Sequence, residues 1–108
     1  MATKIGYLFE SNTEKFNEEL FGELVRSDNV RIERIVSHGH SSPASGWHEQ
    51  AENEWVAVLK GEAKIVFENG EEVHLTTGCH LTIPAHTKHK VTWTTPDSET
   101  IWLAVHYT

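Results

Sequence analysis

The sequence predicts an all-β protein of antiparallel strands, arranged as a sandwich or barrel. Short segments in which apolar and polar residues alternate recur along the chain, and turn residues interrupt them about every 8–12 residues. Few stretches have the spacing of an amphipathic helix. Asn69-Gly70 is the clearest hairpin signal, because both residues tolerate the positive φ angles of a type I′ turn.

Alternation and turn residues define each element in chain order. Polar residues 10–18 predict a surface loop or helical turn. The expected strands cover residues 20–26, 30–37, 54–59, 63–68, 72–75, 79–83, 89–94 and 101–105, with turns at 27–29, 60–61, 69–70, 77–78 and 96–97 between them. In the strand 89–94, we expect His89, Val91 and Trp93 on the inner face, with Lys90, Thr92 and Thr94 outside.

Two of these strands, 55–59 and 101–105, are apolar on both faces. Successive side chains of a strand point to opposite faces, so both faces of the sheet should be buried there. A small barrel achieves this burial by pairing with a second copy, and we therefore expect a homodimer.

Length and charge limit the class of protein. The chain has 108 residues, which suits one domain over residues 1–108. Sixteen acidic against nine basic residues give a net charge of −7, which disfavours binding to nucleic acid or an anionic membrane. No signal peptide and no apolar run of transmembrane length is visible, and Cys79 has no partner for an internal disulfide. We expect a cytoplasmic protein.

Four polar residues suggest a site inside the barrel. His48 and Gln50 are two positions apart and project to the same side of an extended segment, Glu54 shares a face with Val56, and His89 points inward. Imidazole and carboxylate groups are good ligands for divalent metals, and the amide oxygen of Gln50 is a weaker one. The set predicts a site for Fe, Mn, Ni or Zn, with a metal-free hydrogen-bonded pocket as the alternative.

The spacing of these residues resembles the two motifs of the cupin superfamily. The first motif lies at about residues 40–61 and the second at about 78–93; the matching residues are His48, Gln50, Glu54 and Gly61, then Gly78, Pro84 and His89. The chain departs from the pattern at Gln50, where the family has a histidine, and at His86, where it has a glycine. Trp93 replaces an asparagine and Ser42 a glycine. The resemblance implies a double-stranded β-helix, or jelly roll, like the small single-domain RmlC-like bacterial cupins.

Other aromatic residues and histidines are candidates for the pocket wall. Trp93 shares the face of His89, Trp47 could cap the mouth beside His48, and His40 could contact substrate or replace the missing ligand. We interpret His86 as exposed. The remaining histidines, His74, His80 and His106, are interpreted as surface or structural residues.

The resemblance implies a pocket that binds a divalent metal and a small polar or carbonyl-bearing molecule. It allows metal-dependent dioxygenase, isomerase or decarboxylase chemistry, and the sequence assigns no catalytic residue. The alternative is a metal-free module that binds a sugar or small acid without catalysis. A metal-free epimerase with His48 as base is disfavoured, because it needs a tyrosine acid and the only tyrosines, Tyr7 and Tyr107, lie near the termini.

Overall fold

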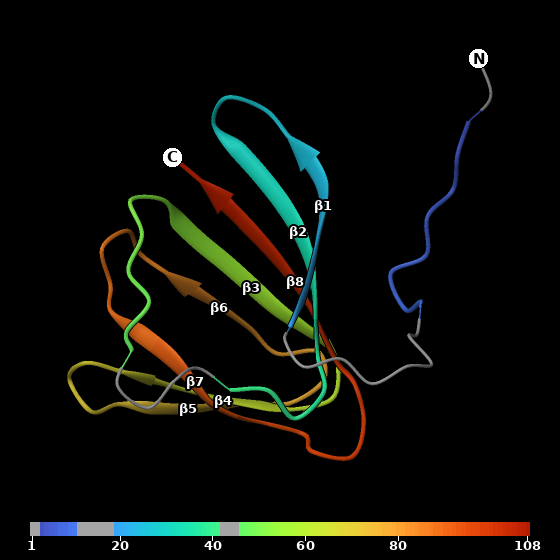
Figure 1. Cartoon of the computed structure of the whole chain (residues 1–108). Coiled ribbons are helices and arrows are strands. Elements are labelled where there is room, and N and C mark those ends of the chain that lie inside the picture. Colours follow the sequence, from blue (N-terminus) through green and yellow to red (C-terminus); the bar gives the residue numbers. More distant parts are fainter. Residues whose placement is uncertain (1–2, 11–18, 42–45) are drawn as a thin grey trace.

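The computed structural model describes residues 3–10, 19–41 and 46–108, and this part of the chain is all β (Figure 1). Its strands are β1 (Leu20–Arg26), β2 (Val30–Ser37), β3 (Asn53–Lys60), β4 (Ala63–Phe67), β5 (Glu72–Leu75), β6 (His80–Ile83), β7 (His89–Thr94) and β8 (Thr100–Tyr107). The eight predicted strands are confirmed, with bounds that differ by up to two residues. Most of the polar segment 10–18 lies outside the described residues.

The strands form two antiparallel sheets. One has the order β1-β2-β8-β3-β6 and the other the order β5-β4-β7. β8 is central because it pairs with β2 along one side and with β3 along the other. Figure 1 shows β4, β5 and β7 as a separate layer beside the five-stranded sheet. Within the described ranges, the protein has no helix that is long and apolar enough to cross a membrane.

The hydrophobic core lies between the two sheets. Strand alternation directs one apolar set from each sheet inward, and the buried cluster contains Val56, Val58, Trp102 and Ala104 together with Ala63, Ile65, Leu75 and Ile83. Full burial of a valine or isoleucine side chain stabilises the fold by about 1.5–3 kcal/mol. The cluster therefore fixes how the two sheets pack, and this packing determines the space left between them.

A β-bulge in β7 changes the predicted face of Trp93. Lys64 pairs with Trp93, but the next residue, Ile65, pairs with Val91, so β7 has one extra residue at this point. The extra residue reverses the alternation. Trp93 consequently lies on the outer face beside Lys64 and His74, while Thr94 is only 2% exposed. The prediction that Trp93 points inward with His89 and Val91 is wrong.

Two turns have backbone φ angles that differ from those the sequence pattern suggests. The turn at Asn69-Gly70 is present, but only Gly70 has a positive φ, of 93°, so it is not the predicted type I′ turn. The Gly70 N–H donates to the Phe67 carbonyl. His86, where the cupin pattern has glycine, has a φ of 62°. A left-handed backbone conformation is therefore kept at a position where this chain has a side chain.

Candidate binding pocket

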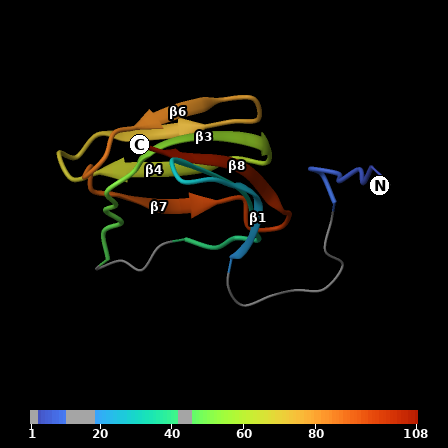
Figure 2. The same ribbon diagram turned by 90° about the horizontal axis from the view of Figure 1, so that it is seen from above.

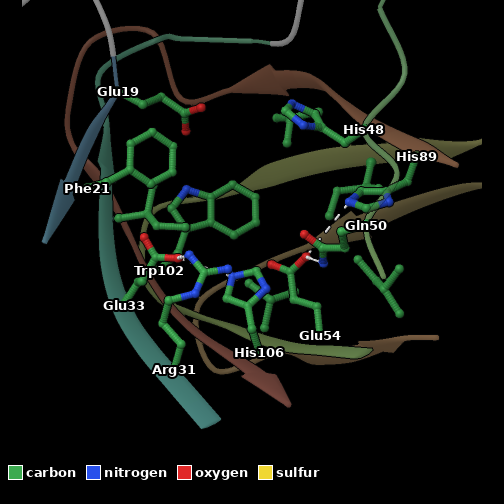
Figure 3. Close-up of a pocket in the computed structure, with 15 residues that line it drawn as sticks. Glu19, Phe21, Arg31, Glu33, His48, Gln50, Glu54, His89, Trp102 and His106 are labelled. Atoms are coloured by element: carbon green, nitrogen blue, oxygen red, sulfur yellow. Dashed lines mark hydrogen bonds and ion pairs between the residues drawn. The ribbon is translucent and has the colours of Figure 1, made fainter. Parts of the chain in front are cut away.

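A cavity of about 320 Å³ lies between the sheets (Figure 3). Its described lining consists of Glu19, Phe21, Arg31, Glu33, Ile35, His48, Gln50, Glu54, Val56, Ile65, Ile83, His89, Val91, Trp102 and His106. The volume is at the lower end of the range of about 300–1,000 Å³ that is usual for small-molecule sites. The lining combines apolar core residues with polar groups from distant parts of the chain.

All four residues predicted for the site line this cavity. His48 and His89 exchange backbone hydrogen bonds of 2.8 and 3.0 Å, which attach the segment before β3 to the start of β7. The Gln50 carbonyl accepts a hydrogen bond of 2.7 Å from the N–H of His86. Glu54 lies near the start of β3, paired with Ile83 on one side and His106 on the other. Long-range backbone pairing thus brings the two sequence motifs together.

The side chains of three of these residues form a hydrogen-bonded group. The Gln50 amide donates to Glu54 Oε1 at 3.0 Å. His89 Nδ1 lies 2.9 Å from the carbonyl of Thr87, a contact that needs a proton on Nδ1. Nε2 then faces Glu54 Oε1 at 3.8 Å. His48 lies above this group, with its ring centroid 6.0 Å from that of His89 (Figure 3).

The arrangement does not fit a resident metal ion. Among the residues that the structure describes, no group of three or more His, Cys, Asp or Glu is placed to hold one. Gln50 presents its N–H to Glu54, and an amide nitrogen that carries hydrogens is not a metal donor. The carboxylate that should bind the metal is instead the acceptor of this hydrogen bond.

A second polar cluster, which the sequence analysis missed, lies next to Glu54 in the pocket lining, because His106 pairs with Glu54 across β8 and β3. Arg31 contacts Glu33 at 2.7 Å and Glu52 at 3.0 Å, and His106 Nε2 lies 3.3 Å from Glu33 Oε1. His106 is only 6% exposed, and its Nδ1 atom has no hydrogen-bond partner among the residues that the structure describes. The interpretation of His106 as a possible surface residue is wrong. Trp102 and Ala104 alternate with it along β8, so extending the predicted strand by two residues would have placed it inside.

A third polar contact holds the wall of the pocket near β1. The Trp102 indole N–H donates to Ser37 Oγ at 3.2 Å, and Ser37 Oγ donates to Glu19. Trp102 is only 3% exposed. A buried indole N–H needs such an acceptor, and here the acceptor is itself connected to a carboxylate of the lining.

The three residues proposed for the pocket wall are not among the described lining residues. Trp93 is on the outer face for the reason given above. His40 Nδ1 accepts a hydrogen bond of 2.8 Å from the N–H of His38, and its carbonyl accepts one of 2.6 Å from Thr94. Trp47 is 40% exposed, and the ammonium group of Lys90 lies 4.4 Å from its ring centroid. His74, His80 and His86 are exposed, as predicted.

Comparison with known proteins decides the family. The family profile described as Cupin domain matches residues 31–106. The chain is a cupin. A solved structure of a candidate mannose-6-phosphate isomerase from Ralstonia eutropha JMP134 is 37% identical to this cupin, with a TM-score of 0.92 over 97% of this chain and 98% of that one. The predicted superfamily is therefore confirmed.

More distant structures show the same fold. A cupin superfamily protein from Desulfitobacterium hafniense DCB-2 is 24% identical, with a TM-score of 0.72 over 87% of this cupin and 81% of that chain. The iron(II) form of HppE is 21% identical, with a TM-score of 0.70 over 82% of this cupin and 50% of that chain. No curated protein matches this cupin.

Proposed function

We propose that this cupin binds a small neutral molecule with several hydroxyl groups, of the sugar class, and that it does so without a resident metal. The observation that carries the proposal is the hydrogen bond from Gln50 to Glu54, which occupies the carboxylate of the expected metal site. The pocket lining then combines polar groups with apolar walls. Such a lining suits a ligand with polar edges and an apolar face.

The charges of the lining favour a neutral ligand. Glu19, Glu33 and Glu54 contribute carboxylates, whereas Arg31 contributes the one guanidinium group among the described lining residues. Arg31 is already paired with two glutamates. Carboxylates accept hydrogen bonds from hydroxyl groups and repel phosphate or carboxylate groups. We therefore favour a sugar over a small acid or a sugar phosphate. The 37% identical relative is named for a sugar phosphate, and only the sugar part of that name agrees with this pocket.

His106 supports the same class of ligand. A proton on Nε2 can be directed to Glu33, and the imidazole then has a bare acceptor at Nδ1, for which the described part of the chain provides no donor. A hydroxyl group is a donor of suitable size for such an atom. His106 and Glu54 are paired across β8 and β3, so a single ligand can contact both.

A divalent-metal site is the second candidate, and one observation favours it. The hydrogen bond from His89 Nδ1 to Thr87 fixes the ring with Nε2 toward Glu54, as is usual for metal-binding histidines. A metal would require the Gln50 amide to turn its oxygen inward. The dioxygenase or isomerase-type activity expected from the sequence belongs to this second candidate.

Two measurements separate the candidates. Elemental analysis of protein purified without an affinity tag should show no stoichiometric Fe, Mn, Ni or Zn. In thermal unfolding, neutral hexoses such as mannose should raise the Tm at millimolar concentration, and mannose 6-phosphate should raise it less. Glu54→Gln should remove the shift, whereas Glu71→Gln, an exposed residue outside the pocket, should not. A stoichiometric metal that is lost in His89→Ala would instead establish the second candidate, and a response to mannose 6-phosphate alone would contradict the charge argument.

A further inference from the structure

Trp102, Ser37 and Glu19 form a series of hydrogen bonds whose direction is fixed. The Trp102 indole N–H donates to Ser37 Oγ at 3.2 Å, and Ser37 Oγ donates to Glu19 Oε2 at 2.5 Å. An indole nitrogen can only donate, so Ser37 accepts from it and directs its own hydroxyl proton toward Glu19. Trp102 and Ser37 are both buried. The Glu19 carboxylate is therefore held as an acceptor in the lining of the pocket.

Glu19 differs from the other two carboxylates of the described lining. Glu33 accepts from a guanidinium group, and Glu54 accepts from an amide N–H. For the Glu19 side chain, the described residues provide one donor, the Ser37 hydroxyl. An ionised carboxylate has about four acceptor positions. Most of the hydrogen-bonding capacity of Glu19 is therefore available to a ligand in the pocket, provided that the ligand presents donors.

Two aromatic rings accompany Glu19 in the lining. Phe21 follows Glu19 by two positions, near the start of β1 at the edge of the five-stranded sheet (Figure 2). It is 63% exposed although it lines the pocket, so its ring lies at the mouth, whereas Trp102 is buried. Figure 3 shows Glu19 and Phe21 on the side of the pocket away from Gln50. A carboxylate beside aromatic rings suits a ligand ring that has an apolar face and hydroxyl groups along its edge.

We propose that Glu19, Phe21 and Trp102 form a subsite, called here the Glu19 subsite, for one edge of a pyranose. The apolar face of the sugar stacks on Phe21, and two neighbouring hydroxyl groups donate to the Glu19 carboxylate. This inference rests on the sugar-binding function proposed above and adds which part of the sugar is recognised. A hydroxyl group can donate to Glu19, but a hydrogen atom or a methyl ether at the same carbon cannot. Glu19 is thus a specificity-determining residue for sugars with an unmodified pair of adjacent hydroxyl groups.

Calorimetric titration with mannose and its monodeoxy derivatives tests the Glu19 subsite. Two derivatives that lack adjacent hydroxyl groups should bind wild-type protein about 10- to 100-fold more weakly than mannose, because each loses a hydrogen bond to a carboxylate. In Glu19→Ala this difference between mannose and the two derivatives should disappear, because the acceptor is gone. Glu23→Ala, which removes an exposed carboxylate of the same strand outside the described lining, is the matched control and should keep the difference.

A conservative variant covers the case in which Glu19→Ala does not fold. Glu19→Gln keeps an acceptor for Ser37 but loses the charge, so the difference between mannose and the two derivatives should shrink by at least about threefold. Phe21→Ala should weaken mannose binding by about tenfold, whereas Leu24→Ala, an exposed apolar residue of β1 outside the described lining, should not.

The outcomes separate this inference from the function on which it rests. If wild-type protein does not bind mannose, both the sugar-binding function and the Glu19 subsite are wrong. If mannose binds, but no pair of adjacent hydroxyl groups matters or the Glu19 variants keep the full difference, the Glu19 subsite alone is overturned. Unchanged mannose binding in Phe21→Ala would likewise contradict the stacking on Phe21 and leave the sugar-binding function standing.

Discussion

Gly61, the closing glycine of the first cupin motif, should be the turn glycine that is most costly to replace. Its φ is +86°, a conformation that residues with a side chain rarely adopt. A Cβ atom at this position would lie 2.6 Å from Thr100 Oγ1 and 2.9 Å from Thr100 Cα. Both distances are below any ordinary contact, and the second involves backbone that cannot rotate away. Gly61→Ala should therefore displace the start of β8, the central strand of the sheet.

The size of the loss follows from two contributions. The left-handed backbone costs about 1–2 kcal/mol for a residue with a Cβ atom. The contact with Thr100 adds about 1–3 kcal/mol, the usual range for overpacking. Gly78 provides the matched control, because its φ is +93° and a Cβ atom added there would meet nothing within 4 Å. Gly78→Ala should cost only the backbone contribution, so the two variants should differ by about 1–3 kcal/mol in the free energy of unfolding.

Urea denaturation followed by tryptophan fluorescence measures this difference. The midpoints and slopes of both variants and of the wild-type protein give the free energies of unfolding under one set of conditions. Because a dimer would make the midpoints depend on concentration, all three proteins should be compared at the same concentration. Equal losses in Gly61→Ala and Gly78→Ala would show that the contact with Thr100 is not the reason for glycine at position 61.

Two further substitutions test the backbone and the second polar cluster. His86→Gly should stabilise the protein by about 0.5–1 kcal/mol, because glycine adopts the φ of 62° without steric cost. The control Lys88→Gly, two positions away, should not stabilise it. A loss of stability in both variants would contradict this reasoning. Glu33→Gln should cost about 1–3 kcal/mol in urea denaturation, because Arg31 and His106 lose their shared carboxylate, and the more exposed Glu52→Gln should cost less.

The order and approximate bounds of the strands could be predicted because alternation and turn residues are local signals. The bulge in β7 could not, because it depends on how β7 pairs with β4. Residues 89–94 alternate regularly in sequence, and only the register of Lys64 with Trp93 and of Ile65 with Val91 reveals the extra residue. One inserted residue was enough to move Trp93 from the predicted pocket wall to the outer face.

The candidate site also has one part that the sequence could predict and one part that it could not. The spacing of His48, Gln50, Glu54 and His89 is a property of one chain segment at a time, and all four line the pocket, whereas their role as metal ligands stays a prediction. The second polar cluster joins Arg31 and Glu33 of β2 to His106 of β8, 75 and 73 positions away along the sequence. No spacing rule connects such residues. Their contact follows from the antiparallel register of β2 and β8, which places Arg31 opposite His106.

The identity of residue 50 determines whether Glu54 can act as a metal ligand. A histidine here would offer a bare nitrogen as a metal donor and would leave Glu54 free to act as a second ligand. The glutamine instead offers two N–H groups on its amide nitrogen, and the nearest strong acceptor is the Glu54 carboxylate. A charge-assisted hydrogen bond of this kind is stronger than one between neutral groups, and it competes directly with metal binding at the same oxygen. One substitution thus converts two prospective ligands into a donor–acceptor pair, while the backbone contacts of Gln50 and His89 that build the pocket stay in place.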